Sequence, residues 1–161
     1  MSKAKKTRTR RANVTIDETT MLPDILQKLQ KLTSQEVHIG VDGGEEIAMI
    51  AGILEHGSIK AKIPARSFIG AGRKKAAATI SKMVKAGLQA IVEGNKQPED
   101  LLQELGAAAK DRVLRNFDRI RTPPLSPIYA KRKGSNKILI DEQNLRDSIT
   151  YVVVSKRRRS R

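Results

Sequence analysis

Apolar residues recur at two different spacings in the first third of the chain. A stripe at three- and four-residue steps begins at Leu22, with Pro23 in the first turn, and predicts an amphipathic helix of about three turns. The stripe consists of Leu22, Ile25, Leu26, Leu29 and Leu32. Residues 36–42 instead alternate between apolar and polar side chains, which predicts a half-buried strand that ends at a Gly-Gly pair. His38 falls on the polar side of this strand, where we expect it to be solvated.

Three further helices are predicted after this strand. A pair of glutamates begins the second helix, and Gly57 is a suitable residue to end it. The third helix runs from about Gly72 to Gly94 and has an apolar face. Its other face carries Arg73, Lys74, Lys75, Lys82 and Lys85. Pro98 starts the fourth helix, whose apolar stripe continues to Ile120, so the third and fourth helices form the longest helical pair.

The remaining segments predict loops and short strands. Residues 58–68 form an extended loop around Pro64, and residues 122–136, with three prolines, form a long loop of the kind that tends to be functional or mobile. The last predicted elements are a short strand at 138–140, a turn at 142–145 and a buried strand in the β-branched run 149–154.

Charge divides the chain into a body and two ends. Its 32 Lys and Arg and 17 Asp and Glu give a net charge of +15. Residues 1–11 contain six basic residues and residues 155–161 contain five, with no acid in either segment, so subtracting these eleven charges leaves +4 for the rest. We therefore predict a basic arm over 1–13, disordered or ordered by a partner, a single α+β domain over 14–154, and a basic tail over 155–161.

The two basic ends can neutralise phosphates without reading a base sequence, or can dock on an acidic protein subunit. The cations concerned are Lys3, Lys5, Lys6, Arg8, Arg10, Arg11, Arg157, Arg158 and Arg159. The chain has only two Phe and two Tyr, which argues against recognition of single strands by base stacking. The sequence leaves both partners open.

Candidate catalytic chemistry is sparse. There is no Cys, and His38 and His56 are the only imidazoles, with no metal-binding spacing around them. Nucleophile and phosphate-binding motifs are absent from the sequence. Glu55 and His56 are adjacent on a predicted helix and point about 100° apart, which favours helix-end capping or a subunit contact over acid–base catalysis. We expect no enzymatic activity, no cofactor, no metal and no membrane span, since no apolar run approaches the required length.

Three segments, taken in order, resemble a known group of proteins. The first is Ile47–Ser58 followed by Ile63–Phe68, a helix ending in Glu-His-Gly and then Pro-Ala-Arg-Ser-Phe. The second leads from Leu105-Gly106 to Asn116-Phe117. The third is the most specific and comprises Pro124–Pro127, Tyr129–Gly134, Ile138–Asp141 and Leu145–Tyr151. This order resembles the neck, tail-completion or head-tail joining proteins of tailed bacteriophages. Glu142, Gln143 and Asn144 replace the Thr-Gly turn usual in that family.

The resemblance implies an α+β fold with two long helices on one face of a small antiparallel sheet. It implies a non-enzymatic virion protein, assembled in the host cytoplasm, that forms a ring of six or twelve copies between portal or connector and tail proteins in the neck. The basic arms would then contact packaged double-stranded DNA or an acidic neighbour. An alternative from another class is a small basic nucleic-acid-binding protein that acts as a monomer or dimer through its two arms.

Within the ring hypothesis, specific side chains are assigned to subunit contacts. The predicted interface residues are Glu55, His56, Pro64, Arg66, Phe68, Tyr129 and Leu145. Arg66 offers a planar fork of donors and Phe68 a large ring, both typical of interface anchors, although Phe68 can equally fill the core of its own chain. Lys131, Arg132 and Lys133, next to Tyr129, are predicted to contact phosphates or partner carboxylates, or to be a solvated loop.

Overall fold

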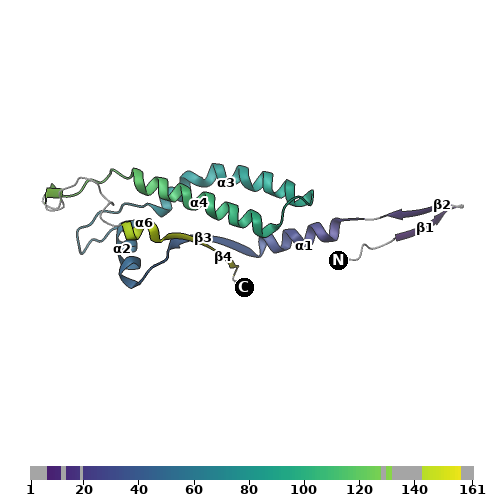
Figure 1. Ribbon diagram of the computed structural model, residues 1–161, viewed down its shortest axis with the longest axis horizontal. Helices are drawn as coiled ribbons and strands as arrows, with labels where there is room; N and C mark the ends of the chain where they lie inside the picture. The colour runs from purple at the N-terminus through teal and green to yellow at the C-terminus, as the bar shows by residue number, and fades with distance from the viewer. Residues whose placement is uncertain (1–6, 12–13, 19, 128–129, 132–142, 157–161) are drawn as a thin grey trace.

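The computed structural model describes residues 7–11, 14–18, 20–127, 130–131 and 143–156 (Figure 1). Its elements are β1 (Thr7–Arg11), β2 (Val14–Glu18), α1 (Leu22–Thr33), β3 (Gln35–Val41), α2 (Glu45–His56), α3 (Ile69–Val92), α4 (Pro98–Arg119), α6 (Gln143–Ser148) and β4 (Ile149–Ser155). The predicted α+β fold is confirmed. In the described part of the chain, no helix is both long enough and apolar enough to cross a membrane.

The two longest helices, α3 and α4, pack side by side as an antiparallel pair (Figure 1). Glycines allow the close approach. A Cβ atom on Gly72 would lie 2.8 Å from the Cα atom of Val113, and a Cβ atom on Gly87 would collide with the side chain of Leu101. Gly72 and Gly87 are both buried on α3, so this helix presents a glycine to α4 near each end of their contact.

The predicted small sheet is a two-stranded antiparallel ribbon. It pairs β3, from the first part of the chain, with β4, near its C-terminal end. Its register pairs Gln35 with Ser155 and Val41 with Ile149. The helix α4 packs on both strands, and the ring of Tyr151 lies over Gly106, where a side chain would leave no room for it. The long helices thus cover one face of the ribbon, as predicted (Figure 1).

The main core lies where α2, the start of α3, the second half of α4, α6 and the start of β4 meet. It consists of Ala51, Phe68, Val113, Phe117, Leu145 and Ile149. The rings of Phe68 and Phe117 pack edge to face, with centroids 5.3 Å apart and an interplanar angle of 88°. This geometry suits the charge distribution of aromatic rings and adds to the stabilisation that burial provides.

Three local predictions differ from the structure. Residues 7–11, expected to be irregular, form β1 and pair with β2, because the β-branched run that follows supplies an antiparallel partner for their backbone. The turn expected at 142–145 is replaced by α6 from Gln143. The helix α3 begins at Ile69, three residues before the predicted Gly72. The strand predicted at 138–140 lies outside the described residues.

The glycine contact between α3 and α4 gives a first prediction. Gly72→Ala places a methyl group 2.8 Å from the Val113 Cα atom, so the two helices must separate and the free energy of unfolding should fall by about 1–3 kcal/mol. Gly52→Ala is the matched control, because a Cβ atom on this exposed α2 residue meets nothing within 4 Å. It should raise stability by up to about 1 kcal/mol. Denaturant unfolding measures both; equal effects would contradict the close packing.

Candidate functional site

The carboxylate of Glu55, at the end of α2, caps the start of α3. Its Oε2 atom accepts hydrogen bonds from the amides of Phe68 at 2.8 Å and Ile69 at 2.9 Å, and its Oε1 atom accepts from the Gly70 amide at 2.8 Å. The Ser67 hydroxyl donates to Oε1 at 2.6 Å. The first turn of α3 has no acidic residue of its own, so this carboxylate satisfies amides that helix geometry leaves unpaired.

The same contacts determine the charge of Glu55. Burial opposes ionisation, but the hydrogen bonds from the Ser67 hydroxyl and from the three amides together outweigh it and hold the pKa of Glu55 below its ordinary value. The carboxylate is therefore ionised near neutral pH, and its oxygens accept hydrogen bonds from the amides at the start of α3. This is the capping role that sequence analysis left open, and it turns the carboxylate away from any acid–base role with His56, which is exposed.

Asn116, on α4, holds the start of α3 from the other side. This side chain is buried, and its Nδ2 atom donates a hydrogen bond to the Phe68 carbonyl at 2.9 Å. Its Oδ1 atom accepts from Lys75 Nζ at 2.6 Å. The backbone of Phe68 is thus hydrogen-bonded on both sides: its amide donates to Glu55 and its carbonyl accepts from Asn116. These two bonds fix the position of its ring in the core.

Arg66 connects three segments that are distant in sequence. Its amide donates to the Leu54 carbonyl at 2.7 Å. Its guanidinium donates through Nε to the Pro123 carbonyl at 3.1 Å and through Nη2 to the Pro124 carbonyl at 3.3 Å. The residue is buried, and burial lowers its pKa. Arg66 therefore ties the end of α2 to the segment that follows α4.

These contacts correct part of the predicted interface. Phe68 and Leu145 are fully buried in the core of their own chain, and Arg66 is 7% exposed and bonded internally, so none of the three side chains is an anchor on the surface. The alternative that Phe68 fills its own core is the one observed. The reason is that Glu55 and Asn116 turn this loop inward. Pro64 and His56 are exposed.

The basic candidates are distributed between described and undescribed segments. Arg8, Arg10 and Arg11 belong to β1. Lys131 is exposed and follows the segment that contains Pro123 and Pro124, the partners of Arg66. The remaining candidates, Lys3, Lys5, Lys6, Tyr129, Arg132, Lys133, Arg157, Arg158 and Arg159, lie outside the described residues. The predicted contact of these side chains with a partner stays a prediction.

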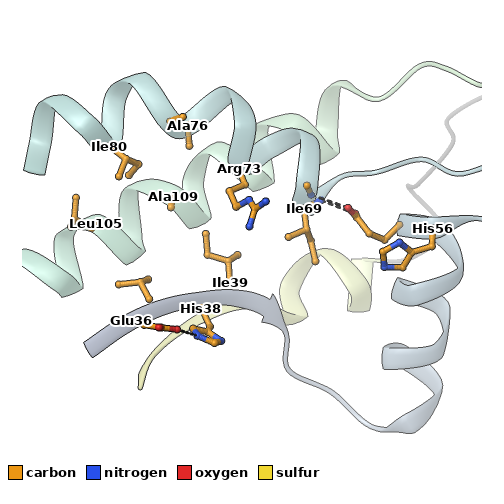
Figure 2. Close-up of a pocket in the computed structure, with 14 residues that line it drawn as sticks. Glu36, His38, Ile39, His56, Ile69, Arg73, Ala76, Ile80, Leu105 and Ala109 are labelled. Carbon is orange, nitrogen blue, oxygen red and sulfur yellow. Dashed lines mark hydrogen bonds and ion pairs between the residues drawn. The ribbon is translucent and has the colours of Figure 1, made fainter. Parts of the chain in front are cut away.

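A groove of about 810 Å³ runs between β3 and α3, on the side of β3 away from β4 (Figure 2). Its walls are mostly apolar and come from Val37, Ile39, Ile69, Ala76, Ala77, Ile80, Leu105 and Ala109. Arg73 extends from α3 toward β3, where the Glu36 Oε2 and His38 Nε2 atoms are hydrogen-bonded at 3.0 Å (Figure 2). His38 is exposed, as predicted from the alternation of β3. No strand among the described residues pairs with this edge of β3.

Sequence reasoning identified Glu55 as a capping candidate but missed Ser67 and Asn116, which also position the start of α3. Ser67, the residue two before α3, was a possible signal because hydroxyl residues are favoured at helix starts, and its Oγ atom accepts a hydrogen bond from the Ala71 amide at 3.2 Å. Nothing in the local pattern around Asn116 indicates its contact with Phe68. Among the described residues, no group of three or more His, Cys, Asp or Glu is placed to hold a metal ion.

Comparison with protein-family models, with curated proteins and with solved structures finds no match to this chain. The functional proposals below therefore rest on the chain's own residues and on the resemblance of its three segments to phage neck proteins.

Loss of the Glu55 charge gives a second prediction. Glu55→Gln keeps the size of the side chain but removes the anionic acceptor for the three amides, so stability should fall by about 2 kcal/mol. Asp111→Asn is the control, because Asp111 forms an exposed ion pair with Arg115 on one helix and should contribute at most about 0.5 kcal/mol. Denaturant unfolding at pH 7 compares the two variants. Equal losses would show that the cap has no special role.

A third prediction concerns pH. The pKa of Glu55 is lower in the folded chain than its ordinary value of 4.5, so its contribution to stability is complete above about pH 4.5 and is lost as pH falls through the folded pKa. The difference in unfolding free energy between the native chain and Glu55→Gln should therefore be constant above pH 5.5 or so and shrink below 4.5. Unfolding curves between pH 3 and 7 measure it. A difference independent of pH would contradict the assignment.

Proposed function

We propose that this chain is a structural subunit that assembles with copies of itself into a ring in the neck of a tailed bacteriophage. The observation that carries the proposal is the partly exposed apolar stripe of α1: Ile25, Leu29 and Leu32 are half-buried, but the first turns of the stripe stay open. No residue of this helix is buried, and Leu22 and Leu26 remain 63% and 57% exposed. Met21, just before the helix, is also exposed. An amphipathic helix with its apolar side in water is stabilised when a second surface covers that side.

Two further features support association between copies. The β1–β2 hairpin extends beyond α1, away from the body formed by the other elements (Figure 1). The outer edge of β3 has no strand partner in the described part of the chain, and such edges readily pair with another chain. A contact in which one surface of a subunit meets a different surface of the next is the type that closes rings. We assign the covering surface to a second copy.

The role of such a ring follows from the resemblance of the three segments. The proposed function is to join or close the passage between head and tail of the virion, without enzymatic activity, in contact with portal or connector proteins on one side and tail proteins on the other. Assembly would occur in the host cytoplasm. Packaged double-stranded DNA is the proposed polyanion near the basic arms, whose charge favours its approach.

The alternative function is a small basic nucleic-acid-binding protein that acts as a monomer or dimer through its two arms. The net charge of +15 supports it. The two hypotheses differ in their expected assembly. The ring hypothesis requires a discrete high-order oligomer that forms without nucleic acid, whereas the alternative requires a monomer or dimer whose binding to duplex weakens steeply with salt.

A fourth prediction tests the ring through α1. Leu22→Gln combined with Leu26→Gln removes apolar surface from the proposed contact and should raise the concentration needed for assembly at least tenfold, which is about 1.4 kcal/mol. Met49→Gln is the control, because Met49 on α2 is similarly exposed at 60% but lies on a different part of the body. Native mass spectrometry and electron microscopy of the purified chain measure the oligomer. A native chain that stays monomeric at all concentrations and never joins portal or tail proteins would overturn the proposal.

A further inference from the structure

The helix α3 carries charge of one sign only. Its 24 residues include five Lys and Arg and no Asp or Glu, and the wider segment 60–92 has no acid either. Its neighbour α4 is different, with four basic and five acidic residues over 22 positions. The two helices lie side by side, so the contrast is not a property of the whole helical pair. It concentrates positive charge on α3.

Three of these cations are exposed at the surface. Lys74, Lys82 and Lys85 are exposed and have no ion-pair or hydrogen-bond partner among the described residues. The other two basic residues of α3 make contacts within the protein: Lys75 donates a hydrogen bond to Asn116, and Arg73 lines the groove beside β3. Three acidic residues of α4 form ion pairs with residues outside α3: Asp111 with Arg115, Asp118 with Arg146 and Glu104 with Lys96.

The three lysines share one side of α3. From Lys74, the positions of Lys82 and Lys85 are rotated by about 80° and 20° at 100° per residue, and Lys85 is about 17 Å farther along the axis. The other exposed positions between them are Lys75, which donates to Asn116, and the small residues Ala77, Ala78 and Ser81. No aromatic residue occurs in α3. We term this side of the helix the α3 lysine face (Lys74, Lys82 and Lys85); all three side chains are exposed, and α3 itself lies at the edge of the molecule (Figure 1).

We propose that the α3 lysine face binds the phosphate backbone of double-stranded DNA without sequence preference. Unpaired cations spaced along a straight helix can each neutralise a phosphate and release counterions, and the small residues between them let the backbone approach closely. A protein partner is less well matched, because the face lacks the aromatic or large apolar anchor that protein interfaces use. Single-stranded nucleic acid is also less well matched, because base stacking needs aromatic rings.

The proposal does not depend on the ring. A single subunit presents the face, and the lysines lie on a different helix from the α1 stripe that is proposed to hold copies together. The basic arms, which contribute their own attraction to DNA, remain unchanged in the test below. The experiment must therefore measure how much the three lysines add to DNA binding beyond the binding that the basic arms provide.

The test compares two triple variants of the full chain with the same change in net charge. One is Lys74→Gln, Lys82→Gln and Lys85→Gln. The control is Lys60→Gln, Lys62→Gln and Arg119→Gln, since these side chains are also exposed and have no ion-pair partner among the described residues. Binding of a fluorescent 30-base-pair duplex is measured against salt concentration. Each lost phosphate contact lowers the slope of log K against log salt by about 0.9, so the first variant should lose about 2.7 and the control less than 0.9.

Three results bear on the proposal. A variant with Lys74→Arg, Lys82→Arg and Lys85→Arg should keep the native slope, because Arg also contacts phosphates. Equal slopes for the two triple variants would overturn the proposal, since only net charge would then matter. A lysine variant that binds duplex as the native chain does but fails to assemble in native mass spectrometry would also overturn it, because the face would then be a subunit contact. Failure of the native chain to assemble would contradict the proposed ring but not the proposed binding of DNA.

Discussion

The fold depends on one carboxylate at the junction of two helices. Glu55, in the last turn of α2, accepts hydrogen bonds from amides at the start of α3, so the direction in which the longest helix leaves the core is fixed by a residue on another element. The bonds of Asn116 to the Phe68 carbonyl and of Arg66 to the Pro123 carbonyl act on the same short segment. Together they orient Phe68 into the core, where its ring meets Phe117. Burial of that ring stabilises the arrangement, but the polar contacts select it.

Once α3 is fixed at its start, the glycines determine how closely it can follow α4. Gly72 and Gly87 bring the helix backbones together, and Gly106 brings α4 down to Tyr151 on the ribbon. This packing places the small residues of α3, among them Gly72 and Gly87, against larger apolar side chains of α4, among them Val113 and Leu101. It leaves the α3 lysine face outward and α1 at the margin of the body, with an apolar stripe that the described elements cover only in part, since Leu22 and Leu26 stay exposed. The surfaces assigned to DNA and to a second copy are therefore consequences of the same packing.

The two proposed surfaces differ in the physical interaction they use. The α1 stripe offers apolar area, which stabilises contact over a short range and depends little on salt. The α3 lysine face offers unpaired charge, which attracts a polyanion and weakens as salt rises. In the proposed neck subunit, the first surface would hold neighbouring copies and the second would bind DNA. The resemblance of three sequence segments to phage neck proteins links these properties to one biological setting.

Much of the secondary structure follows from the sequence, because helices and strands repeat locally. The three- and four-residue spacing after Leu22, the alternation of residues 36–42 and the glycine at position 57 each correspond to an observed element, with Gly57 at a φ of 79°. The run of cations without acids in residues 60–92 is equally visible in sequence. Only the tertiary structure decided which way Arg66 and Phe68 face, because their partners lie 57 and 49 positions away, at Pro123 and Phe117. Local periodicity carries no information about such distant contacts, and the side-chain chemistry that suggested an interface for Arg66 and Phe68 fits their buried positions equally well.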